Sequence, residues 1–204
     1  DDVLKMGRTQ LQDAVLIRLG QEFRAYSQAV RRDISRFERA KDEMRCLNMG
    51  GTAVGTGINA DERYLRRIVP NLCKVTGLDL IQAHDLIDAT QNLDEFVAVS
   101  GTVKTCAVNL SKMSNDLRLM SSGPRCGFGE INLPPRQNGS SIMPGKVNPV
   151  IPEVVNQICF KVIGNDFAVT MASEAAQLEL NVMEPVMVES LVESATWMSR
   201  AFST

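Results

Sequence analysis

Apolar residues recur along much of the chain at spacings that place side chains on one face of an α-helix. Over residues 23–44 they alternate with charged residues, which predicts one long amphipathic helix. A narrower stripe alternates spacings of three and four residues, and its members are Phe96, Val99, Val103, Cys106, Leu110, Met113, Leu117 and Met120. A stripe of this width is expected to pack against other long helices.

Two further helices follow from the same pattern. One begins near Pro149, whose ring suits a first helical turn, and continues to Ile163. The other covers roughly residues 182–204. Since no convincing series of strands and no repeat of fixed period accompanies them, the predicted fold class is all-α, a bundle of long helices.

Two irregular segments interrupt the helices. Residues 50–57 are rich in glycine, but they lack the Gly-Lys-Ser/Thr ending of a phosphate loop, and no strand pattern precedes them. Nucleotide binding is therefore not favoured. Residues 121–149 contain prolines that exclude a continuous helix, and a loop of this length in a compact helical protein is usually functional.

Composition and charge narrow the class of protein. With 44% hydrophobic and 23% charged residues the chain is globular, and its net charge of −2 offers no overall attraction to nucleic acid or an anionic membrane. Five cysteines without a Cys-x-x-Cys pair and a single histidine, His84, give no support for a metal site. They fit a cytoplasmic protein with reduced thiols. We expect neither a membrane span nor a cofactor.

The loop formed by residues 139–149, called the candidate loop below, concentrates chemistry. Ser140, Ser141, Lys146 and Asn148 bring two hydroxyls, a cation and an amide within nine residues. A carboxylate could be bound by the ammonium group, the amide and the N–H groups of the following helix. The structural alternative is a solvated loop with Asn148 capping that helix, and composition alone favours this alternative.

The order of residues in the candidate loop favours the carboxylate-binding alternative over the structural one. It reads Gly-Ser-Ser-x-Met-Pro-x-Lys-x-Asn-Pro and is followed by Glu153. In this it resembles the aspartase/fumarase superfamily of lyases. The resemblance extends over nearly the whole chain and includes residues 7–14, 20–23, 51–59, 123–125, 130–134, 156–157 and 164–166.

The resemblance implies a lyase that removes a proton beside one carboxylate of a small dicarboxylate and expels a group from the next carbon. By position Ser140 would be the base, and Ser141 would hold the carboxylate on which charge develops. The other carboxylate would be held by Thr9, Lys146 and Asn148, while Val147 would contribute only its backbone. Because this proton is weakly acidic, such a site must supply fixed electrostatic stabilisation, which explains a loop rich in donors.

Gln10, which the resemblance places among the substrate-binding residues, distinguishes between two activities of this superfamily. Fumarases carry histidine at this position, where it is thought to pair with the glutamate corresponding to Glu153. Glutamine cannot titrate, so this pairing is absent and Glu153 is expected to be structural. Some aspartases resemble the chain here and in residues 156–166 and 181–185. We therefore expect reversible deamination of L-aspartate to fumarate and ammonia, with fumarate hydration as the alternative.

The resemblance also implies an organisation. Residues 1–204 would form the central helical domain, which carries the candidate loop and the contacts between subunits. The chain lacks an initiator methionine, and domains that precede and follow this one in the superfamily are not part of it. The whole protein would be a homotetramer with active sites shared between subunits, whereas the 204 residues alone would be without useful turnover. An inactive helical oligomerisation fragment is the remaining alternative.

Overall fold

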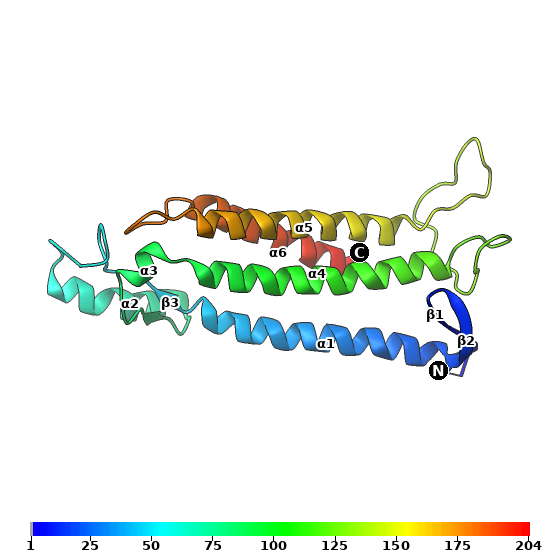
Figure 1. Cartoon of the computed structure of the whole chain (residues 1–204), viewed down its shortest axis with the longest axis horizontal. Coiled ribbons are helices and arrows are strands. Elements are labelled where there is room, and N and C mark those ends of the chain that lie inside the picture. The colour runs from blue at the N-terminus through cyan, green and yellow to red at the C-terminus, as the bar shows by residue number, and fades with distance from the viewer. Residues whose placement is uncertain (1) are drawn as a thin grey trace.

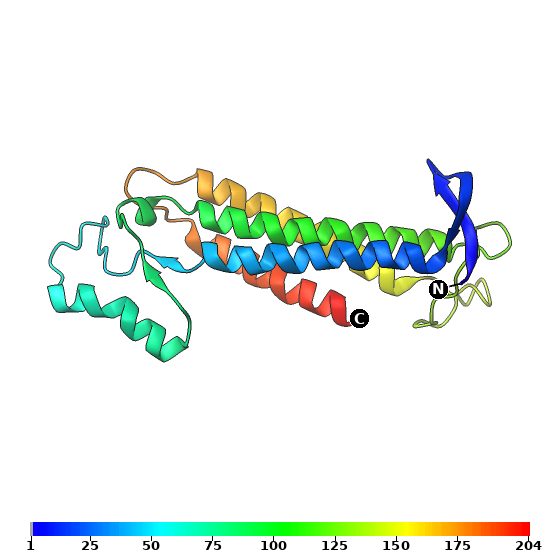
Figure 2. The ribbon, with the colours of Figure 1, turned by 90° about the horizontal axis from the view of Figure 1, so that it is seen from below.

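Four long helices lie side by side in a computed structural model, which describes residues 2–204 and leaves Asp1 outside (Figure 1). They are α1 (Leu19–Glu43), α4 (Asp94–Met120), α5 (Val150–Glu174) and α6 (Glu184–Ser203). Helices α1 and α5 run away from one end of the bundle, and α4 and α6 return toward it (Figures 1 and 2). The predicted helices and the all-α class are confirmed, although Pro149 precedes the first turn of α5 as its N-cap.

Helix α4 packs on α5 through small side chains as well as through the predicted apolar stripe. Ser100, Ala107 and Ser111 are buried, whereas the stripe residues Phe96 and Leu110 are only half-buried. Small side chains allow two helices to approach closely. A buried cluster then fills the space between α4, α5 and α6, and its members are Val103, Cys106, Ala107, Val155, Cys159, Val162, Met198 and Ala201.

Buried polar residues fix the register of these helices. The Ser100 hydroxyl donates to Asp166 at 2.8 Å, and the Lys104 ammonium donates to the same carboxylate at 2.6 Å. The Asn156 amide donates to the backbone oxygen and the hydroxyl of Ser111 at 3.0 and 2.9 Å. A buried polar group left without its partner costs about 1–3 kcal/mol, so a shifted register is penalised at both ties.

A two-stranded hairpin, which the sequence pattern did not predict, precedes α1. Strand β1 (Leu4–Thr9) pairs with the antiparallel strand β2 (Gln12–Arg18). The turn residues Gln10 and Leu11 have φ angles of 53° and 61°. Positive φ at both positions is typical of a type I′ turn, which usually contains Asn-Gly. The absence of that signature, and the exposure of Val15 on β2, explain why the apolar pattern did not reveal a hairpin.

The smaller elements gather at the opposite end of the bundle (Figures 1 and 2). They are β3 (Cys46–Leu47), α2 (Glu62–Thr76), β4 (Ile81–Gln82) and α3 (Asp88–Gln91), with β3 and β4 paired in parallel. The glycine-rich segment also lies here. A Cβ on Gly55, whose φ is +87°, would come within 2.3 Å of the Cα of Ile87. Close packing therefore explains this glycine without a bound phosphate.

No helix within residues 2–204 has the length and apolar character needed to cross a membrane.

Candidate functional site

The candidate loop closes on itself through backbone contacts. The Lys146 N–H donates to the Met143 carbonyl at 3.1 Å, and Gly145 within this turn has a φ of +84°. A Cβ built on Gly139 would lie 3.3 Å from the Lys146 carbonyl, so the two ends of the loop approach each other. The loop is thus a narrow-necked projection from the hairpin end of the bundle (Figure 1).

Ser140 occupies a distinctive position within this loop. Its hydroxyl oxygen accepts hydrogen bonds from the backbone N–H groups of Ile142 and Met143, at 3.2 and 3.3 Å. Donors aimed at an oxygen stabilise its anionic form more than its neutral form. The local backbone thus already supplies part of what a serine needs to act as a base. Ser141, the next residue, is exposed.

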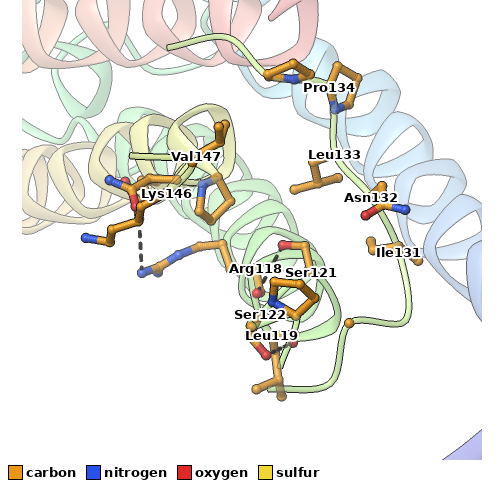
Figure 3. A pocket seen from close by; sticks show the side chains of 18 of the residues that line it. Arg118, Leu119, Ser121, Ser122, Ile131, Asn132, Leu133, Pro134, Lys146 and Val147 are labelled. Carbon is orange, nitrogen blue, oxygen red and sulfur yellow. Dashed lines mark hydrogen bonds and ion pairs between the residues drawn. The ribbon is translucent and has the colours of Figure 1, made fainter. Parts of the chain in front are cut away.

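The end of the candidate loop lines a cavity of about 790 Å³ together with the end of α4 and the start of α5 (Figure 3). Three of the predicted binding residues meet there, namely Lys146, Val147 and Asn148, together with Glu153, which the sequence predicted to be structural. Ser140 and Ser141 lie on the same loop but do not line this cavity. Residues from the segment between α4 and the candidate loop form its opposite wall, including Ile131, Asn132, Leu133 and Pro134 (Figure 3).

Arg118 is a cavity residue that the sequence analysis missed. In Figure 3 its side chain, from α4, and that of Lys146, from the candidate loop, extend toward the same side of the cavity. Its guanidinium lies 3.8 Å from the Glu153 carboxylate and donates to the Asn156 amide oxygen at 3.2 Å. One signal was available, since Arg118 is the last charged residue before α4 gives way to the irregular segment.

Thr9 and Gln10 lie apart from this cavity within the described chain. Both are exposed at the tip of the hairpin, where Thr9 ends β1 and Gln10 begins the turn. Thr9 lines a second cavity of about 470 Å³ between the hairpin, α1 and α4, and Gln10 lines neither cavity. The chain therefore presents the predicted site residues as two separate groups at one end of the bundle.

Charged residues fix the hairpin to the segment that follows α4. The Lys5 ammonium lies 2.7 Å from Glu22 and 3.1 Å from Glu130, and Arg8 forms a short ion pair with Glu130. The Arg8 guanidinium also lies 4.2 Å from the centre of the Phe128 ring. Burial alone would raise the pKa of Glu130, but hydrogen bonds from Arg8 and Lys5 outweigh it and hold this pKa below its usual value.

The remaining candidate groups do not form a site. His84 is exposed. Cys106 and Cys159 are buried in the helix core, and burial raises their pKa values to about 12 and about 11. Among residues 2–204, no group of three or more His, Cys, Asp or Glu side chains is arranged to hold a metal ion.

These features define a helix bundle whose candidate loop brings Lys146 and Asn148 to one cavity. Comparison with known proteins assigns the class of the chain. The family model described as "Lyase" matches residues 1–164, which is more than half of the chain. The chain therefore belongs to this lyase family, and the predicted relationship to the aspartase/fumarase superfamily is confirmed.

Individual relatives agree with this class. Aspartate ammonia-lyase of Bacillus subtilis is 58% identical over 202 residues, covering 99% of this chain and 42% of the relative. Aspartate ammonia-lyase of Escherichia coli strain K12 is 55% identical over 200 residues, which are 98% of this chain and 42% of the relative. The chain thus spans about two fifths of the length of these relatives.

Solved structures share the fold. A fumarate lyase:delta crystallin from Brucella melitensis superposes with a TM-score of 0.95 at 52% identity, covering 98% of this chain and 44% of that one. A class II fumarase from Schistosoma mansoni gives a TM-score of 0.91 at 34% identity, covering 98% of this chain and 45% of the fumarase.

Proposed function

We propose that the complete protein containing this chain is a carbon–nitrogen lyase that converts L-aspartate reversibly to fumarate and ammonia. Relatives named aspartate ammonia-lyase, at 55–58% identity over nearly the whole chain, support this activity. The observation that carries the proposal is the pair of backbone N–H groups on the Ser140 hydroxyl oxygen. They favour the alkoxide that must accept a weakly acidic carbon-bound proton.

The remaining residues take roles that suit their chemistry. Ser141 would hold the carboxylate on which charge develops, where a hydroxyl donor is most stabilising. The cavity that joins Lys146 and Asn148 supports their role in binding the other carboxylate, with Val147 contributing its backbone. Thr9 would contact the same carboxylate from a hairpin. Gln10 would not neutralise the charge of a substrate carboxylate, because its side-chain amide is uncharged and does not titrate.

The separation of Thr9 from the candidate loop favours an active site shared between chains, and we propose a homotetramer of this bundle. Large apolar side chains on the outer face of α5 support an intersubunit contact, since Phe160 and Phe167 are 61% and 68% exposed. Within that assembly residues 1–204 would be the central domain of a longer, cytoplasmic protein. Light scattering of the 204-residue chain tests the assembly, since a mass of one chain would contradict it.

Activity is tested in the complete protein by following the ultraviolet absorbance of fumarate after L-aspartate is added. Ser140→Ala should reduce the rate by about 10²–10⁴-fold, the contribution typical of a positioned base. Ser27→Ala, at an exposed position of α1, is the matched control and should retain the wild-type rate. A protein that hydrates fumarate to malate but releases none from L-aspartate would select the alternative, fumarate hydratase.

A further inference from the structure

Arg118 is fixed in place by residues outside the cavity that it lines. Its guanidinium donates to the side-chain oxygen of Asn156 at 3.2 Å, and Asn156 is itself 2% exposed. The other end of that amide donates to the backbone oxygen and the hydroxyl of Ser111. Since both ends of the Asn156 amide are occupied, its oxygen faces α4 and determines where the guanidinium lies. The hydrogen bond to Asn156 therefore holds the Arg118 guanidinium in a defined position against α5.

That position brings Arg118 to Glu153. The distance from the guanidinium to the Glu153 carboxylate is 3.8 Å, and both side chains are about two fifths exposed or less. Glu153 stands in the first turn of α5, where its N–H donates to the Pro149 carbonyl at 3.3 Å. The residues that immediately precede Pro149 are those predicted to bind a carboxylate. Arg118 thus acts at the junction between the candidate loop and α5.

The charged residues that line this cavity differ in whether they form an ion pair. Arg118, Lys146 and Glu153 are its charged lining residues in the described chain. Arg118 and Glu153 pair with each other, while no ion pair involves Lys146 within residues 2–204. Gln10 supplies no cation to Glu153, because it is an amide and lies outside this cavity.

A carboxylate inside an anion-binding cavity is a competitor for the substrate. An unpaired Glu153 would attract the Lys146 ammonium and would repel an incoming carboxylate, and both effects weaken binding. A guanidinium suits the task of neutralising it, because its planar set of donors can engage the Glu153 carboxylate and the Asn156 amide together. A lysine at this position would carry the same charge on a flexible stem.

We propose that Arg118 is a positioning residue that holds Glu153 as its counter-ion and thereby leaves Lys146 available to a carboxylate of the substrate. The inference deepens the proposed function and rests on it for the identity of the substrate. Arg118 itself acts through Glu153 and makes no contact with the reacting atoms. Glu153, expected from the sequence to be structural, would by itself weaken the binding of a carboxylate, and Arg118 prevents this by neutralising its charge.

The test is a cycle of variants in the complete protein, with succinate as a non-reacting four-carbon dicarboxylate. Calorimetric titration of Arg118→Met should give a dissociation constant for succinate at least about tenfold above wild type, equivalent to about 1.4 kcal/mol. Glu153→Gln should bind succinate as well as wild type or better. In the double variant, removal of the carboxylate should restore binding to within about threefold of wild type. Arg118→Lys should stay within a similar range, since it keeps the charge.

A purely structural brace would give a different pattern. If Arg118 only joined α4 to α5, the double variant would bind succinate no better than Arg118→Met, and that result would overturn the proposal. Tenfold weaker binding by Glu153→Gln would also overturn it, because Glu153 would then help to bind the ligand. The Glu153→Gln variant therefore tests the proposal even if Arg118→Met fails to fold. If the wild type does not bind succinate, Lys146 is not available to a carboxylate as proposed, and the inference is wrong.

Kinetics separates this inference from the proposed function. With L-aspartate, Arg118→Met should raise KM at least about tenfold with a smaller change in kcat, and the double variant should recover KM. If the wild type releases no fumarate from L-aspartate, the proposed activity is wrong, while the succinate titrations still decide the role of Arg118. If turnover is present but Glu153→Gln does not rescue Arg118→Met, the inference alone fails.

Discussion

Lys5, on the first strand of the hairpin, lies 3.1 Å from Glu130, which is separated from it by more than a hundred residues of sequence. Glu130 also pairs with Arg8, and its backbone N–H donates to the carbonyl of Met120 at 2.8 Å. One carboxylate therefore holds two cations of the hairpin while its own backbone is fixed to the end of α4. The position of the hairpin tip, which carries Thr9, depends on this contact.

Glu130→Gln should release the hairpin from the bundle, because an amide removes the charge while preserving the size of the side chain. We expect amide hydrogen exchange in β1 and β2 to become at least about tenfold faster, equivalent to about 1.4 kcal/mol of local stability. Glu62→Gln is the matched control, since Glu62 forms an exposed ion pair with Arg66 and should leave the hairpin unchanged. Unchanged exchange in Glu130→Gln would show that apolar contacts hold the hairpin.

The contribution of Glu130 should depend on pH in a defined direction. Because its pKa is lower in the folded state, its stabilisation is present above the ordinary value of 4.5 and is lost as the pH falls through the folded value. The difference in free energy of unfolding between wild type and Glu130→Gln should therefore be full near neutral pH and shrink in acid. Urea unfolding at a series of pH values measures it. A difference that grows below pH 4.5 would contradict this explanation.

Met187→Ala should be among the more destabilising truncations in the bundle. Met187 is fully buried and packs with Val169 and Ala172, so its loss leaves a cavity costing about 2–5 kcal/mol. Met143→Ala, in the candidate loop where the side chain is 48% exposed, should change stability by less than about 0.5 kcal/mol. Urea unfolding compares the two, and equal midpoints would argue against tight packing around Met187.

Four of the five cysteines should react with a thiol reagent in two groups. Cys46 and Cys126 are exposed and should be labelled rapidly in the folded chain. Cys106 and Cys159 should be labelled only after unfolding, because they are buried and burial raises the pKa of both thiols, which lowers the thiolate fraction. Mass spectrometry of labelled peptides assigns the groups. Rapid labelling of Cys106 would mean that α4 and α5 separate readily.

Sequence alone was enough to predict the long helices, the class of fold and the candidate loop. Helical periodicity is a local property, so the stripe from Phe96 to Met120 predicted α4 without knowledge of its partners. The loop residues were identifiable for a similar reason, since Ser140, Lys146 and Asn148 lie within nine positions of one another. Even here the N–H groups that approach the Ser140 hydroxyl depended on how the loop folds.

Which distant residues meet depends on how the helices and the hairpin pack in three dimensions. The hairpin turn places Gln10 in a left-handed backbone conformation that a glutamine does not predict. The hairpin is fixed by the carboxylate of Glu130, which follows α4 in the sequence. The pairing of Arg118 with Glu153 likewise required α4 and α5 to pack in one register, which Asn156 and Ser111 select. Such contacts depend on the summed packing of whole helices, and no short stretch of sequence contains that information.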